Sequence, residues 1–78
     1  MTDVVFHNIR VSYDESHERV RNFVTYLKDL KRKEEMTAYY DEARGHSDGK
    51  IHIDDGKGNE FTLVCRSGHN CELRLRGM

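Results

Sequence analysis

The chain has 78 residues, which is the size of one small domain. Thirteen basic residues against fourteen acidic residues leave a formal net charge of -1, so no overall positive field draws the protein toward nucleic acid or an acidic membrane. No apolar run approaches the ~18 residues that cross a bilayer, and the first residues lack the basic start and apolar stretch of a secretion signal. We therefore expect a single domain over residues 1–78, located in the cytoplasm and without a membrane partner.

Residues 4–11 are rich in β-branched side chains and predict a first strand. In the alternation that we favour, Val5 and Val11 face the core, while Phe6 lies on the outer face beside polar neighbours. Asp14 and Ser16 follow as candidate N-caps, because their side-chain oxygens can accept hydrogen bonds from the first N–H groups of a helix.

An apolar stripe at helical spacing then runs through residues 16–30. Its members are Val20, Phe23, Val24, Leu27 and Leu30. This pattern predicts one main helix, over about residues 16–35, that covers one face of a sheet.

The phase of this stripe breaks after residue 30, in a wholly charged segment, and Met36, Tyr39 and Tyr40 are left without evident burial. Residues 36–44 are either a continuation of the helix to Arg44 or a strand. We favour the strand, because such a long helix would present two apolar faces and a small core covers only one.

Glycine-rich turns divide the rest of the chain into short alternating runs. The predicted strands are Lys50–Asp54, Glu60–Arg66 and Cys71–Arg76. Aligning their apolar positions gives the cross-strand pairs Ile51–Leu63, Ile53–Phe61, Leu63–Leu73, Phe61–Leu75 and Cys65–Cys71, since a slip of one residue would turn every side chain over. The predicted fold is an α+β two-layer sandwich with one N-terminal strand, one main helix and an antiparallel meander of three or four strands.

Cys65, His69 and Cys71 have a spacing that offers three ligands to zinc, with His7, His46 or His52 as the fourth. The predicted register instead puts both cysteines on the apolar face, where a free cysteine is commonly a small core residue. A cross-strand disulfide is the third alternative, because directly opposed Cβ atoms lie about 4.5–5.5 Å apart. We favour two reduced core thiols, and we expect no metal and no cofactor.

The sequence contains no nucleophile elbow, no H-E-x-x-H motif and no pair of carboxylates whose spacing indicates acid/base catalysis. We therefore expect a protein without enzymatic activity. The alternative enzyme is a small toxin-like ribonuclease, whose residues would be His52, Tyr40, Arg66, Arg74 and Arg76.

Basic residues gather in two places. Lys28, Lys31, Arg32 and Lys33 lie late in the predicted helix, and Arg66, Arg74 and Arg76 lie on the outer face of the predicted sheet. Acidic residues interleave both groups, and the outer face lacks the aromatic side chains on which bases stack. A nucleic-acid-binding module is therefore the alternative function.

Exposed aromatic, methionine and arginine side chains are enriched in protein interfaces. The residues that fit this description are Phe6, Met36, Tyr39, Tyr40, Arg66, Arg74 and Arg76. We expect a small regulator or inhibitor, of the kind that phages and mobile elements encode, which occupies the surface of a partner protein. An edge strand could also pair with a second copy of the chain, so a homodimer is the alternative assembly.

Overall fold

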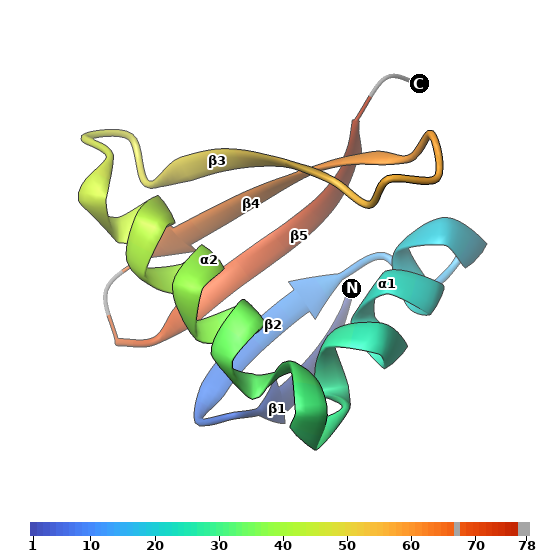
Figure 1. The fold of residues 1–78 in the computed structure, drawn as a ribbon, viewed down its shortest axis with the longest axis horizontal. Helices are drawn as coiled ribbons and strands as arrows, with labels where there is room; N and C mark the ends of the chain where they lie inside the picture. The colour runs from blue at the N-terminus through green and yellow to red at the C-terminus, as the bar shows by residue number, and fades with distance from the viewer. Residues whose placement is uncertain (67, 77–78) are drawn as a thin grey trace.

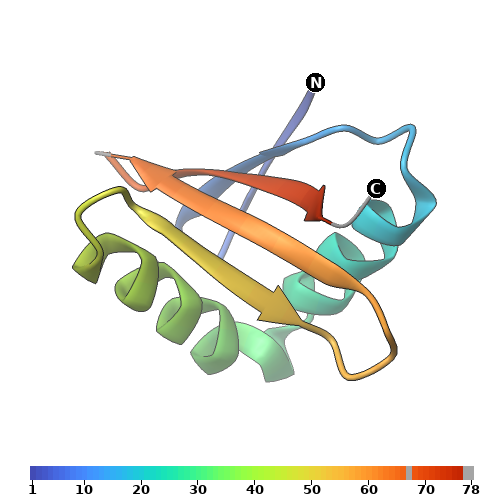
Figure 2. The ribbon, with the colours of Figure 1, turned by 90° about the horizontal axis from the view of Figure 1, so that it is seen from above.

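The computed structural model describes residues 1–66 and 68–76. Within them the chain forms β1 (Thr2–Phe6), β2 (Ile9–Tyr13), α1 (Glu18–Lys28), a short 3-10 turn η1 (Leu30–Arg32), α2 (Lys33–Gly45), β3 (Lys50–Asp54), β4 (Glu60–Arg66) and β5 (Asn70–Arg76). The strands make one sheet in the order β1-β2-β5-β4-β3 (Figure 1). Both helices pack on the same face of this sheet, and the other face is bare (Figure 2).

The expected α+β architecture of two layers is therefore confirmed, but the sheet is mixed rather than purely antiparallel. β2 runs parallel to β5, whereas the other neighbouring strands are antiparallel. Parallel neighbours need a long crossover connection, and here the two helices and the first part of the meander supply it. No helix within the described residues is long and apolar enough to span a membrane.

The C-terminal meander has the register predicted from its apolar pattern. Ile53 lies opposite Phe61, and Leu63 lies opposite Leu73. On the bare face, Glu60 lies opposite Arg76. The alternation predicts this register because a slip of one residue would expose the whole apolar set.

The N-terminal region is a hairpin, so the prediction of one continuous strand is wrong. His7 and Asn8 form its turn with φ angles of 51° and 66°, and Phe6 pairs with Ile9 across it. A two-residue turn with positive φ reverses the chain and resets the alternation of side chains. Phe6 therefore points into the core at 8% exposure, while Val5 points outward at 65% exposure, which also corrects the expected outward position of Phe6.

The expected strand over residues 36–44 is also wrong, since this segment belongs to α2. The backbone becomes extended at Asp29, whose side chain accepts a hydrogen bond from the N–H of Lys31 (2.9 Å). The ring of His7 donates to the carbonyl oxygen of Leu27 (2.8 Å) and so satisfies the end of α1. Because the chain turns at this point, Leu30 leaves the apolar stripe and is exposed.

This break explains why the apolar phase changes along the sequence. On α2 the buried residues are Met36, Tyr40 and Ala43, at the spacing of one helical face. Two short helices can each turn one apolar face to the same core, which one long straight helix cannot do. The start of α1 differs from expectation as well, because its N-cap residue is His17, and Asp14 instead accepts from the N–H of Ser16 in the preceding turn.

Cys65 and Cys71 are joined by a disulfide, so the favoured reading of two reduced thiols is wrong. The predicted register places them directly opposite each other on β4 and β5, with Cα atoms 4.0 Å apart. Both side chains are buried within the core.

Candidate functional site

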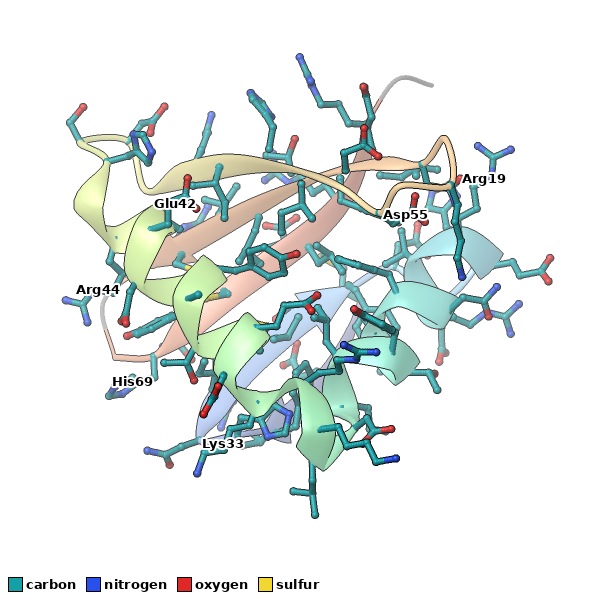
Figure 3. The ribbon with its side chains drawn as sticks, viewed as in Figure 1. Arg19, Lys33, Glu42, Arg44, Asp55 and His69 are labelled. Carbon is teal, nitrogen blue, oxygen red and sulfur yellow. A yellow bond between two sulfur atoms is a disulfide. The ribbon has the colours of Figure 1, made fainter. Side chains whose placement is uncertain are left out.

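A hollow of about 450 Å³ lies between α1, the beginning of α2 and the loop that joins β3 to β4. This volume falls within the usual range for ligand pockets. Its lining residues are Arg19, Asn22, Phe23 and Tyr26 from α1, Glu35 and Tyr39 from α2, and Asp54, Asp55, Lys57 and Asn59 from the end of β3 and the loop. We call this hollow the aromatic pocket; Arg19 and Asp55 mark its end of the molecule in Figure 3.

A stack of rings connects the aromatic pocket to the core. The ring of Phe61, which is fully buried, stacks on Phe23 at 4.4 Å between centroids, and Phe23 stacks on Tyr26 at 5.8 Å. The guanidinium of Arg32 covers the Tyr26 ring at 4.7 Å from its centroid. Tyr26 is therefore held between two neighbours before any ligand arrives.

Glu35 is the polar centre of the pocket wall. Its Oε1 accepts from the hydroxyl of Tyr26 (3.0 Å), and its Oε2 accepts from the hydroxyl of Tyr39 (3.2 Å). Burial, followed by the negative charge of Glu35, raises the pKa of Tyr39 to about 12. The hydrogen bond to Glu35 also raises the pKa of Tyr26. Both phenols therefore stay protonated and act as donors.

The β3–β4 loop that forms the other wall is braced by its own hydrogen bonds. The Asp55 carboxylate accepts from the backbone N–H groups of Lys57 (2.8 Å) and Asn59 (3.1 Å), and from the Asn59 side-chain amide (2.8 Å). Asp54 accepts from the N–H of Gly56 (2.8 Å). The bond from the Asn59 side chain is the main cause that lowers the pKa of Asp55. Hydrogen bonds within the β3–β4 loop therefore fix the shape of this wall.

Among the residues expected to bind a partner, Tyr39 alone lines the aromatic pocket. Phe6, Met36 and Tyr40 are buried core residues and offer no exposed surface. The hydroxyl of Tyr40 accepts from Nη1 of Arg44 (2.9 Å), and its ring stacks on His69 at 5.3 Å. Met36 and Tyr40 lacked evident burial because the sequence does not show the turn between α1 and α2, and Phe6 was misplaced because the sequence does not show the turn at His7 and Asn8.

Arg66, Arg74 and Arg76 lie on the bare face of the sheet, with Arg66 at the opposite end of the β4–β5 pair from Arg76. Arg74 donates to Glu72 from Nε (2.7 Å) and from Nη2 (3.1 Å), and this hydrogen bonding lowers the pKa of Glu72. Arg76 lies 3.8 Å from a carboxylate oxygen of Glu60. Two of the three arginines are therefore engaged with acids on the same face.

Of the residues of the alternative ribonuclease, the structure places Tyr40 apart from the rest, whereas His52 and Arg74 lie opposite the same residue, Thr62, on its two neighbouring strands. His52 lies on the bare face of the sheet, where its ring is 3.4 Å from the Thr62 hydroxyl. Tyr40 lies on α2, on the opposite side of the sheet.

The alternative zinc ligands do not form a site either. Cys65 and Cys71 are bonded to each other, and His69 packs on Tyr40. No cluster of three or more residues with metal-ligating side chains occurs in the described part of the chain.

The alternative nucleic-acid residues follow one another around the turn between the helices. Lys28 ends α1, Lys31 and Arg32 lie in η1, and Lys33 begins α2. Arg32 is already engaged, since it covers Tyr26 and lies 3.8 Å from Glu35. The lysines of this group are exposed.

The comparisons with known proteins add no assignment: no family model, no curated protein and no solved structure matches this chain.

The pocket residues that the sequence analysis did not single out come from three separate segments of the chain. The one visible hint was the spacing of Phe23 and Tyr26 on one side of a helix, which stacks their rings.

Proposed function

We propose that this chain is a binding protein without enzymatic activity and that it docks a partner protein at the aromatic pocket. The composition of the pocket carries the proposal, because tyrosine and arginine are the residue types that contribute most to binding energy at protein interfaces. Tyr26, Tyr39 and Arg19 surround one concave site. Ring stacking and the bonds to Glu35 hold the tyrosines in place in advance, which reduces the side-chain entropy lost on binding.

The protonation of the pocket supports binding rather than catalysis. The raised pKa values of Tyr26 and Tyr39 keep both phenols neutral near physiological pH, so neither is poised as a base or a nucleophile. Glu35 already accepts from both hydroxyls, which leaves its carboxylate engaged within the protein. A regulator or inhibitor that occupies a partner's surface needs groups that bind, and it needs no catalytic base or nucleophile.

Site-specific photo-crosslinking in the native host tests the proposal. A photo-crosslinking amino acid at position 22, on the pocket side of α1, should trap one partner protein, identified by mass spectrometry. The same amino acid at position 25 is the matched control, because Thr25 is exposed on α1 but does not line the pocket.

Equal capture of the same proteins from both positions, or no protein captured from position 22, would contradict the proposal. Capture of nucleic acid from position 22 would favour the alternative module. We prefer a protein partner because Arg74 and Arg76 on the bare sheet face are already paired with acids, which weakens their attraction for phosphates.

A further inference from the structure

β3 is one of the two edge strands of the sheet. It pairs with β4 on one side, and no strand of the described residues lies on its other side. In Figure 1 β3 forms the upper border of the sheet, with both helices below it. An edge of this kind presents unpaired backbone groups and can pair with another strand.

The hydrogen bonds just beyond the two ends of β3 show which backbone groups are unpaired. The N–H of Cys65 donates to the carbonyl of Gly49 (2.8 Å), and the N–H of Asp55 donates to the carbonyl of Asn59 (3.2 Å). Residues of an antiparallel pair bond to the neighbouring strand alternately, so the odd-numbered residues of β3 bond to β4. The residues that turn their N–H and C=O groups to the open edge are therefore Lys50, His52 and Asp54.

The charges at the two ends of β3 are not balanced by the neighbouring strand. Lys50 lies opposite Val64 on β4, and Asp54 lies opposite Glu60, a residue of the same charge. Neither Lys50 nor Asp54 makes an ion pair within the described residues. Because like charges at directly opposite positions repel, a cation on the open side of Asp54 would stabilise this end of the strand.

We propose that β3 pairs with β3 of a second copy of this chain, in antiparallel orientation and about a two-fold axis at His52. Among antiparallel registers, this one alone overlaps all five residues of both strands. It sets Lys50 opposite Asp54 of the second copy at both ends, and Ile51 opposite Ile53. The unpaired backbone groups then meet one another, because the register pairs even-numbered residues with even-numbered residues. Pairing through β3 is independent of the partner docking proposed above.

β1, the other edge strand, is less suited to pair with its own copy. An antiparallel pairing about its central residue, Val4, sets the charged Asp3 opposite the apolar Val5. A pairing about Asp3 sets two like charges opposite each other. Charge complementarity therefore favours β3.

The proposed interface is small, because five residues of each copy contribute to it. Ile51 and Ile53 are already buried within their own chain, at 6% and 4% exposure, so pairing covers little further apolar surface. The N–H of Lys50 also donates to the Asp48 side chain (3.1 Å) before any pairing. We therefore expect a weak dimer, whose register is selected by backbone hydrogen bonds and two ion pairs.

Sedimentation equilibrium of the wild type over about 0.01–1 mM measures the dimer, since weak interfaces associate in this range. Hydrogen exchange at the lowest and highest concentration then locates the contact. The amides of His52 and Asp54 should exchange more slowly at high concentration, whereas the amide of Val5 on β1 should be unchanged.

Charge reversal tests the register. Lys50→Glu sets two acids opposite each other at both ends of the pairing and should weaken the dimer by about tenfold. Asp54→Lys should have the same effect, because it sets two bases opposite each other. A mixture of these two variants restores opposite charges at both ends, so it should form a mixed dimer as strong as that of the wild type. The matched control is Lys31→Glu, which makes the same charge change at an exposed position of η1 and should dimerise like the wild type.

A wild type that stays monomeric at the highest concentration would overturn the inference. Equal weakening by Lys50→Glu and Lys31→Glu would do so too, as would a mixture of folded variants that does not recover the dimer. Circular dichroism shows that each variant is folded. Slower exchange at Val5 with no change at His52 would place the contact on β1 instead of β3.

Discussion

The two ends of the molecule use similar residues to different effect. At one end, which we call the turn end, Tyr40 of α2 lies against Arg44 and His69 (Figure 3). At the other end the aromatic pocket places Tyr39 of the same helix, together with Arg19, beside a hollow. Each end combines a tyrosine, an arginine and a stack of rings, but only one of them is open.

The difference lies in which groups donate and which accept. At the turn end the Tyr40 hydroxyl accepts from Arg44, so the cation is used inside the protein, and the tyrosine is buried at 6% exposure. At the pocket the Tyr39 hydroxyl donates to Glu35, and Arg19 is left without a partner among the described residues. The turn end therefore uses its arginine within the fold, whereas the pocket end leaves Arg19 exposed.

The sharpest test of this contrast replaces each of the neighbouring tyrosines by alanine. Tyr40→Ala should lower the free energy of unfolding by about 3 kcal/mol, because it empties a buried aromatic position. Tyr39→Ala should lower it by about 1 kcal/mol, because this ring is half-buried. Chemical denaturation measures both values. Equal losses would remove the distinction between the two ends.

Reduction of the Cys65–Cys71 disulfide should act on the turn end alone. The bridge closes a short loop, with a sequence separation of 6, and constraining such a loop stabilises the fold by about 2 kcal/mol in the chain-entropy model. Denaturation with and without a reductant measures the loss, and hydrogen exchange at the amides of Lys57 and Asn59 in the pocket wall should be unchanged. Faster exchange at these two amides on reduction would show that the two ends are coupled. The cytoplasmic location stays a prediction. Because the cytosol keeps most thiols reduced, labelling of the Cys65 and Cys71 thiols in cells would test this location.

The loop wall of the pocket should loosen in an Asp55→Ala variant, because that carboxylate holds the N–H groups of Lys57 and Asn59. Hydrogen exchange at these two amides should speed up, while exchange in β5 stays slow. Acid should have the same effect on the wild type. The pKa of Asp55 is lowered on folding, so its stabilising contribution is present above the ordinary value of 3.8 and is lost as the pH falls through the folded value. Unchanged exchange in the variant would show that the loop is held by other contacts.

The smallest effect concerns the protonation of Tyr39. Its pKa is raised to about 12 in the folded protein from the ordinary value of 10.0. The folded state therefore holds this proton more tightly than the unfolded state does, and its contribution to stability is full below pH 10 and is lost as the pH rises toward 12. A titration of tyrosinate absorbance should show a late step that Tyr39→Phe removes. Persistence of that step in the variant would assign it to another tyrosine.

The parts of the fold that the sequence predicted are those with local alternation and glycine turns. β3, β4 and β5 follow one another through short connections, so their apolar positions alone set the register. The first hairpin was missed because His7 and Asn8 take up positive φ without a glycine, and such a turn does not interrupt a run of β-branched residues. The helix break was missed because Asp29 is an ordinary surface residue until its side chain accepts from Lys31.

The site was less predictable than the fold. Tyr39 was expected to contact a partner, but Arg19, Tyr26 and Lys57 were not, because they are distant in sequence and converge only when α1, α2 and the β3–β4 loop pack together. Buried Phe6, Met36 and Tyr40 were taken for surface residues for the related reason that burial depends on where each helix and strand turns.

The sequence by itself determined the buried face of α1 and the pairing of the meander, since the period of an apolar pattern follows from local backbone geometry. The tertiary structure decided where the chain reverses, which cysteine chemistry is present, and which donors remain unused. These outcomes depend on contacts between distant segments: Cys65 meets Cys71 on a neighbouring strand, Glu35 takes the hydroxyls of two tyrosines, and Arg19 is left facing the hollow.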